Sequence, residues 1–158
     1  MRGALIVSAA LLATGATGNA DDKKPATKTL AEEAQLLSKK EGWVSDEITL
    51  TLSGGKKEKG RVTVRFVVGK DKSLGTVMSG VAFGDAMVEV GLKDTFELVE
   101  KDGERKIMIT RPDFMEATSL AYSLDGDTLV IKSGVSFNWA GAGVSFKDTK
   151  FTPIKPKK

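Results

Sequence analysis

The sequence contains neither cysteine nor histidine. Without cysteine there is no disulfide, no thiol nucleophile, no thiolate metal site and no residue to carry a lipid anchor. Without histidine the chain lacks the usual general base near neutral pH, the usual ligand of zinc, copper or iron, and the base of Ser-His and Cys-His pairs. Most hydrolase and oxidoreductase mechanisms are therefore excluded, and an enzyme would have only carboxylate, lysine or tyrosine chemistry.

A long hydrophobic run is also missing. The apolar stretch Gly3 to Ala13 is far shorter than the roughly 20 residues that a bilayer span needs. It follows the positive Arg2 and is followed by small residues, with Gly18 and Ala20 at the −3 and −1 positions of a cleavage site. We therefore expect residues 1–20 to be a signal peptide, and the mature protein to be secreted or periplasmic without a stable membrane anchor.

The positive and negative charges of the chain nearly balance. The chain has 24 basic and 21 acidic residues, a formal net charge of +3, and most of the basic residues are lysine. Lysines without clustered arginine or interleaved aromatics are typical of ordinary surface solvation. The composition therefore predicts no nucleic-acid partner, and the length after cleavage suits a single domain.

One helix is predicted after a polar, disordered lead at residues 21–28. Thr29 stands three residues before Glu32, which is the spacing of a capping box. Apolar residues then share one helix face, and charges that complement the helix dipole stand near both ends: Leu30, Ala34 and Leu37; Glu32 and Glu33; Lys39 and Lys40. Gly42 is expected to end the helix, which would pack beside a sheet.

From Trp43 onward the hydrophobic period changes from 3.6 to 2. Nine short strands are predicted, each bounded by glycine, proline or charged turn residues: 48–52, 62–68, 76–83, 87–92, 95–101, 106–110, 118–124, 128–132 and 144–151. Such a meander has two unpaired edges unless it closes into a barrel. We expect a mainly β, up-and-down antiparallel barrel over residues 29–152, with a basic flexible tail at 153–158. A two-sheet sandwich is the alternative.

Two hairpin turns can be named from the sequence. Asp102-Gly103 and Asp125-Gly126 each lie between two alternating segments. Asp-Gly supplies the positive φ angles that a two-residue type I′ turn requires. Both are therefore predicted to join neighbouring antiparallel strands.

Three segments resemble a known family. Tyr122–Ile131 is similar to the Y-x-L-D-G-D-T-L segment of a lipocalin-like domain found in small, uncharacterised, exported bacterial proteins. Leu37–Ser45 resembles the family's opening, where a short helix runs into a glycine and a tryptophan that begin the first strand. Asp148–Ile154 resembles its final strand, although Gly42 and Trp43 are adjacent here, whereas many lipocalins separate these two residues. The resemblance implies a small up-and-down barrel and no particular activity.

Five aromatic side chains are the candidates for ligand binding: Trp43, Phe66, Tyr122, Phe137 and Trp139. Trp43 could form the floor of a ligand cavity or plug the closed end of the barrel. Trp139 lies in the glycine-rich stretch 137–143, which could be a lip over the barrel mouth or a loop whose aromatics cover the core.

Several charged residues are catalytic or metal-binding candidates, and each has an ordinary structural explanation. Two carboxylate pairs could serve glycoside cleavage but are also common on solvated faces: Asp85 with Glu89, and Asp113 with Glu116. Asp125 and Asp127 lack the further oxygen ligands of a calcium loop. The basic group Lys56, Lys57 and Lys59 is expected at a hairpin tip. No catalytic residue, metal site or cofactor is predicted.

The function expected from these features is that of an exported, non-enzymatic protein. It would bind a small apolar or amphiphilic ligand in the cell envelope or medium. The alternatives are a protein-interaction module, such as an inhibitor or an envelope assembly factor with a filled barrel interior, and a carboxylate-based hydrolase. An apolar cavity of a few hundred Å³ would favour the first, and a filled interior the second.

Overall fold

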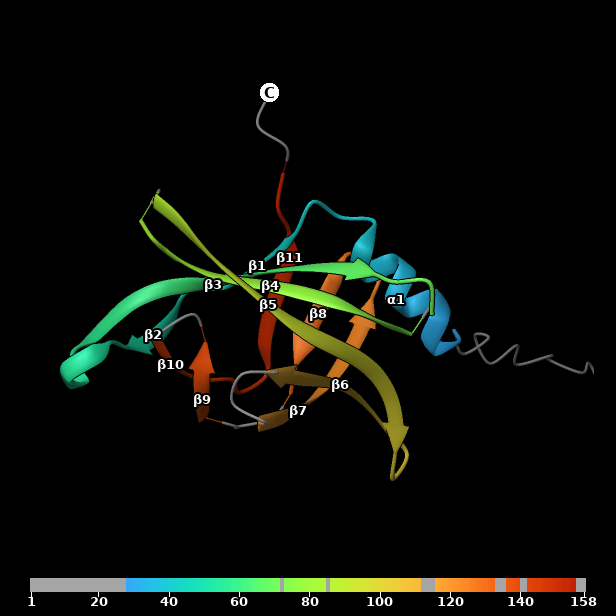
Figure 1. Cartoon of the computed structure of the whole chain (residues 1–158). Coiled ribbons are helices and arrows are strands. Elements are labelled where there is room, and N and C mark those ends of the chain that lie inside the picture. Colours follow the sequence, from blue (N-terminus) through green and yellow to red (C-terminus); the bar gives the residue numbers. More distant parts are fainter. Residues whose placement is uncertain are drawn as a thin grey trace, which may run out of the picture.

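The computed structural model describes residues 28–71, 73–84, 86–111, 116–132, 136–139 and 142–155, without the side chains of 87–93, 116, 136 and 137 (Figure 1). The predicted signal peptide at 1–20 and nearly all of the predicted lead lie outside the described residues. The described chain consists of one helix, one 3₁₀ turn at Ser53–Gly55 and eleven strands. Their bounds are α1 Leu30–Ser38, β1 Trp43–Ser45, β2 Ile48–Thr51, β3 Lys57–Val68, β4 Leu74–Phe83, β5 Ala86–Lys101, β6 Glu104–Arg111, β7 Glu116–Asp125, β8 Thr128–Ile131, β9 Ser136–Trp139, β10 Ala142–Ser145 and β11 Thr149–Pro153.

Eight of the strands close into an antiparallel barrel. Strands β3 to β8 follow one another as a meander, β11 and β1 continue the wall, and β1 pairs with β3 to complete the ring. The predicted mainly β, up-and-down barrel with one short N-terminal helix is therefore confirmed, and the two-sheet alternative is wrong. Closure satisfies the strand edges that an open meander would expose.

The chain bends between β1 and β2, and beyond this bend strands β2, β10 and β9 extend the sheet past the closed barrel. Ser45 lies opposite Val62 while Ile48 pairs with Gly60, so Asp46 and Glu47 face Arg61 alone. The Ser45 hydroxyl accepts the Val62 N–H at 2.8 Å, which replaces a ladder bond. Two residues against one is a β-bulge, and it bends the strand. After the bend, β2 continues to pair with β3 on one side, and on its other side it pairs with β10 of the β9–β10 hairpin, whereas β1 pairs with β11.

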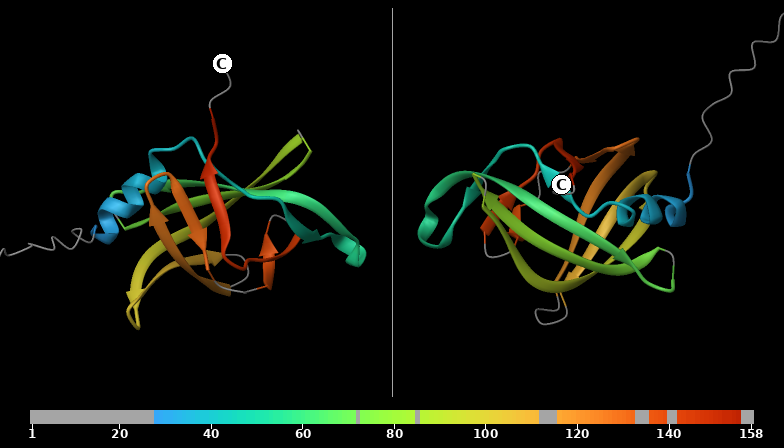
Figure 2. Two further views of the ribbon diagram at one scale, coloured as in Figure 1. Left: turned by 180° about the vertical axis from the view of Figure 1, so that it is seen from behind. Right: turned by 90° about the horizontal axis from the view of Figure 1, so that it is seen from above.

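The two ends of the barrel are consequently different. Helix α1 lies at one end, together with the β3–β4, β5–β6 and β7–β8 turns (Figure 1). Strands β2, β9 and β10 lie at the opposite end, and the views in Figure 2 agree on this separation. We call these the helix end and the hairpin end.

The helix is shorter than predicted. The capping box is present, since Glu32 N–H donates to Thr29 Oγ1 at 3.3 Å and Thr29 N–H donates to Glu32 Oε2 at 2.7 Å. That backbone bond holds the pKa of the exposed Glu32 carboxyl below its usual value. The helix stops at Ser38, so the prediction that Lys39 and Lys40 occupy the last turn is wrong.

Gly42 has a packing role instead of a capping role. It lies beyond the end of α1, and a Cβ added there would come within 2.9 Å of Ile154 Cδ1 and 3.3 Å of Val64 O. Glycine therefore permits the close approach of the last strand to the first. The Ile154 N–H also donates to Gly42 O at 2.9 Å, so the chain remains ordered against the barrel just past Pro153.

The number and bounds of the strands differ from the prediction. Trp43–Ser45, which is not among the nine strands predicted from alternation, forms β1. Residues 87–92 and 95–101, expected as two strands, form the single strand β5 with a register shift opposite Met78/Ser79. The predicted strand 144–151 is split into β10 and β11 by residues 146–148, where Asp148 has a φ of 47°. Residues 136–139, expected in a lip or loop, form β9.

The predicted turns are partly corrected. Asp102 and Gly103 have φ angles of 58° and 73° between the paired Lys101 and Glu104, as a type I′ turn requires. In the second hairpin Asp125 pairs with Thr128, so the turn residues are Gly126 and Asp127, one position later than predicted. Only Gly126 has a positive φ there, 55°, which is the pattern of a type II′ turn.

The basic hairpin tip is also displaced. The chain turns over residues Leu52 to Lys56, and the Leu52 N–H donates a backbone hydrogen bond of 2.7 Å to Lys56 O. Lys57 and Lys59 then lie in β3 and not at the tip, because β3 begins earlier than its apolar alternation suggests. Lys56 forms an ion pair with Glu58.

The apolar side of the wall faces inward, as the alternation predicts. Val64, Phe66 and Tyr122 are all buried. Phe66 and Phe96 pack edge to face with ring centroids 5.0 Å apart, and Phe146 contacts Phe151 in the same way at 5.6 Å. One cluster of buried apolar residues runs from α1 through the barrel to β10. This core fixes the positions of both barrel ends.

Candidate binding groove

A groove opens at the helix end because two strands separate. The ladder between β6 and β7 stops at Lys106 opposite Ala121. Continued pairing would place Arg105 opposite Tyr122, but the β5–β6 hairpin tip diverges from the β7–β8 hairpin (Figures 1 and 2). The resulting helix-end groove has a volume of about 500 Å³ and is lined by Lys28, Glu33, Gly103, Glu104, Arg105, Ala121, Tyr122, Ser123, Leu124 and Lys132.

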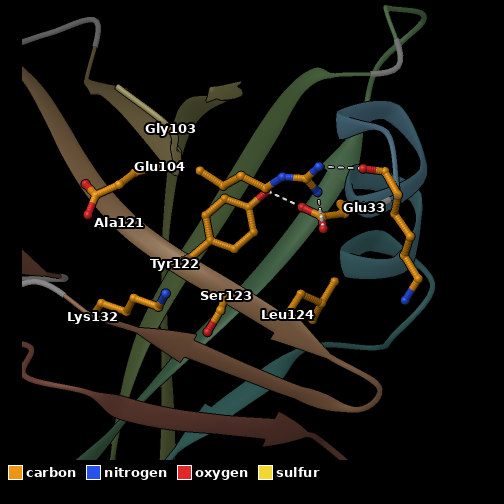
Figure 3. A pocket seen from close by; sticks show the side chains of 10 residues that line it. Glu33, Gly103, Glu104, Ala121, Tyr122, Ser123, Leu124 and Lys132 are labelled. Atoms are coloured by element: carbon orange, nitrogen blue, oxygen red, sulfur yellow. Dashed lines mark hydrogen bonds and ion pairs between the residues drawn. The ribbon is translucent and has the colours of Figure 1, made fainter. Parts of the chain in front are cut away.

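A buried carboxylate ties the two separated strands to the helix. Glu33 lies in the first turn of α1 and is 6% exposed. Its Oε2 accepts a hydrogen bond of 2.6 Å from the Tyr122 hydroxyl, and its Oε1 forms an ion pair with Arg105. The Arg105 guanidinium also donates to Lys28 O at 2.6 Å (Figure 3). The Glu33 triad, which we define as Glu33, Tyr122 and Arg105, therefore forms one wall of the groove.

The phenol in this triad is held in its neutral form. Burial raises the pKa of Tyr122 well above its ordinary value, and the hydrogen bond to the Glu33 carboxylate raises it further. Tyr122 therefore donates its proton to a hydrogen bond and does not titrate near neutral pH. This arrangement suits a rigid binding surface better than proton transfer.

The groove also contains an apolar side chain and a cation. Leu124 is half-buried on β7, and Lys132 is exposed directly after β8 (Figure 3). The Lys132 backbone N–H donates to Ala121 O at 2.8 Å, which fixes the base of that side chain. Within the described part of the chain, no ion pair involves the Lys132 ammonium. The groove thus offers an apolar wall beside a positive charge.

Tyr122 is the one predicted binding residue that lines this groove. Trp43 is 1% exposed, and its indole N–H donates to Leu37 O at 2.9 Å beneath the helix. Phe66 is 3% exposed and packs on Phe96 within the barrel. Trp43 and Phe66 therefore serve the packing of the barrel in this structure.

The other two candidates belong to the hairpin end. Trp139 is buried, donates its indole N–H to Gly80 O at 3.2 Å and packs edge to face on Phe146. The backbone of Phe137 lies in β9, and its side chain is outside the described residues. Beside Trp139 there is a chamber of only about 20 Å³. The four predicted residues whose side chains are described thus do not meet around one ligand cavity.

The charged candidates do not form a described site. Asp85 and Asp113 lie outside the described residues, as do the side chains of Glu89 and Glu116. Asp127 forms an ion pair with Lys40 at 2.7 Å. Among the described residues, no group of three or more acidic side chains is placed to hold a metal ion.

Sequence reasoning missed the residues that define the groove. Glu33 was assigned only to the helix dipole, and Arg105 and Lys132 were not singled out. A signal for Glu33 does exist: it is four residues before Leu37 and so lies on the apolar side of the helix, where a carboxylate needs a partner. The partners themselves come from β6 and β7 and cannot be read from that spacing.

Comparisons with known proteins add no relative. No protein-family description, no curated protein and no solved structure matches this chain. The lipocalin-like resemblance therefore stays a prediction, while the barrel rests on the strand pairing. The helix that the structure describes is too short and too polar to cross a membrane.

Proposed function

We propose that this protein is a non-enzymatic binding protein whose helix-end groove holds a small amphiphilic ligand with an anionic group. The observation that carries the proposal is a contrast in volume. The groove at the helix end measures about 500 Å³, whereas the chamber beside Trp139 measures about 20 Å³. A volume of a few hundred Å³ is typical of small-molecule sites, and a single water occupies most of the smaller one.

The chemistry of the groove favours an amphiphile over a purely apolar ligand. Leu124 and Ala121 offer apolar contact, and Lys132 offers a cation at the rim. Glu33 is already neutralised by Arg105, so its charge does not oppose an anion. The exposed Glu104 disfavours a dianion on its side of the groove, and a single negative charge near Lys132 is the best match.

We also propose that the protein is exported. The predicted signal peptide supports a site of action in the envelope or the medium, where amphiphiles with one anionic group meet exported proteins. The absence of histidine and cysteine supports binding over catalysis. A triad locked by hydrogen bonds supports a preformed site, which loses less entropy on binding.

The packed barrel also favours the second candidate, a protein-interaction module. In that case the same groove would receive a side chain or a chain terminus of a protein partner. Because one surface serves both candidates, binding of a free amphiphile is the measurement that separates them.

Calorimetric titration of the mature protein tests the proposal. We expect saturable binding of dodecanoate below its micellar concentration, and weaker binding of dodecanol and dodecyltrimethylammonium. Lys132→Glu should weaken dodecanoate binding about tenfold, since a lost charge contact of about 1.4 kcal/mol is a factor of ten. Lys150→Glu, on the exposed face of β11, should bind as the wild type does. Equal binding by both variants, or no saturable heat with any of the three ligands, would reject the groove as an amphiphile site.

A further inference from the structure

A second polar cluster lies inside the barrel at the hairpin end, away from the groove. It joins three wall strands through Ser79 on β4, Asp94 on β5 and Arg111 on β6. These residues surround the chamber of about 20 Å³ that β9 covers with Trp139. The three polar side chains lie beside the apolar residues Val77 and Ile109, which also line the chamber.

Ser79 is the first unusual member of this cluster. It is 4% exposed, and within the described structure its hydroxyl has no hydrogen-bond partner. It also stands at the register shift between β4 and β5, where the regular ladder is interrupted. A buried hydroxyl is normally paired with protein or ordered water, so this one indicates a ligand in the chamber.

The neighbouring ion pair has spare hydrogen-bonding capacity. Asp94 is 4% exposed, and its Oδ2 accepts one hydrogen bond of 3.3 Å from Arg111 Nε. Arg111 Nη2 donates to Asn138 O at 2.7 Å. A carboxylate can accept about four hydrogen bonds and a guanidinium can donate five, so a buried pair with these contacts leaves room for another partner.

We infer that this chamber is a binding site for one water molecule, hydrogen-bonded to Ser79 Oγ and to the Asp94–Arg111 pair. The volume meets the roughly 10–15 Å³ that a water requires, and it is too small for an organic ligand. Asp94 disfavours an anion, and Arg111 disfavours a cation. Water is neutral and both donates and accepts, so it alone satisfies all three side chains.

The bound water also fastens the β9–β10 hairpin to the barrel. Among the described residues, the hairpin pairs with the rest of the sheet at Gly143–Thr51. Two of the polar contacts of β9 lie at the chamber: Arg111 donates to Asn138 O, and Trp139 Nε1 donates to Gly80 O beside Ser79. The water orients Arg111, and Arg111 in turn holds β9. This site is independent of the proposed groove, since it lies at the other end of the barrel.

The test combines a high-resolution crystal structure of the mature protein with amide hydrogen exchange. The crystal should show one water within hydrogen-bond distance of Ser79 Oγ and of Asp94 or Arg111. Ser79→Val should fill the chamber and displace the water, and exchange of the β9–β10 amides should become about fivefold to tenfold faster. Thr76→Val, on the exposed outer face of the same strand, should leave both the water and the exchange rates unchanged.

Two results would overturn the inference. One is a wild-type crystal in which Ser79 Oγ is bonded to protein alone and no water occupies the chamber. The other is a folded Ser79→Val variant whose hairpin exchanges at the wild-type rate. If Ser79→Val does not fold, Ser79→Ala takes its place, with the same faster exchange expected and wild-type exchange as the contrary result.

Discussion

Glu33 shows how much one buried side chain can determine at the level of single residues. Its carboxylate receives the Tyr122 hydroxyl and the Arg105 guanidinium, so it links α1 to two strands that no longer pair with each other. Arg105 has a second acidic neighbour, Glu100, at 3.7 Å, but that residue is 57% exposed. The two glutamates therefore offer a matched comparison of a buried and an exposed contact to one arginine.

We expect Glu33→Gln to lower the free energy of unfolding by about 2–3 kcal/mol, because it removes the charge that compensates the mostly buried Arg105. Glu100→Gln should change it by less than about 0.5 kcal/mol, because water screens the exposed pair. Urea unfolding followed by circular dichroism measures both. Equal effects of the two substitutions would show that the Glu33 triad does not hold the helix end together.

At the level of elements, the β3–β4 hairpin depends on close backbone approach. A Cβ at Gly75 would lie 2.1 Å from Val67 O, which belongs to the neighbouring strand, and 2.9 Å from Phe96 Cε1. At Gly143, on β10, the nearest atoms would be Thr51 Cβ and O at 3.4 Å, an ordinary contact distance. One glycine is therefore required by its surroundings and the other is not.

Gly75→Ala should accordingly destabilise the protein by more than about 3 kcal/mol, since a backbone atom and not a flexible side chain must move. Gly143→Ala should cost less than about 1 kcal/mol. Thermal unfolding of the two variants provides the measurement. A Gly75→Ala protein that melts with the wild type would mean that the two strands are further apart than described.

The elements also show what the sequence could predict. Period-2 alternation located most of the wall strands but not β1, and the Thr29–Glu32 spacing located the start of α1, because both signals are local. The end of the helix and the division of residues 144–151 were not predictable in this way. Gly42, the expected end signal, lies beyond the end of α1 and packs against Ile154, and residues 144–151 are interrupted where Asp148 has a positive φ.

The candidate groove was less predictable than the fold for the same reason. Tyr122 is one of the five aromatic residues predicted to bind a ligand, and it does line the groove. The groove itself exists because a ladder stops after Lys106, and no pattern along one strand records where its pairing with another strand ends. Trp43, predicted as a cavity floor or a plug, and Trp139, predicted at a lip or in a covering loop, each donate a hydrogen bond to a backbone carbonyl inside the fold.

At the level of the whole molecule, closure of the barrel couples the ionisation of one side chain to unfolding. Tyr122 is the only tyrosine in the chain, so phenolate absorbance reports on this residue alone. Its pKa is raised in the folded state, whereas in the unfolded chain it ionises near the ordinary value of about 10. Below that pH both states keep the proton. Above it only the unfolded state loses the proton, so stability falls as the pH rises.

We therefore expect the phenolate signal to appear together with the loss of near-ultraviolet circular dichroism, in one alkaline transition. Tyr122→Phe should make the decline of stability above about pH 10 shallower, because the group that ionises on unfolding is gone. A phenolate signal that develops while the protein stays folded would contradict a buried, hydrogen-bonded phenol.

The β9–β10 hairpin has a consequence for how such proteins can diversify. It is inserted between β8 and β11, which are already partners in the wall. Insertions, deletions or new sequences in this excursion leave the registry of every wall strand intact. The shape of the hairpin end can therefore vary without changes in the wall strands. Substitutions near α1, in contrast, must preserve the contacts of Glu33 with Tyr122 and Arg105.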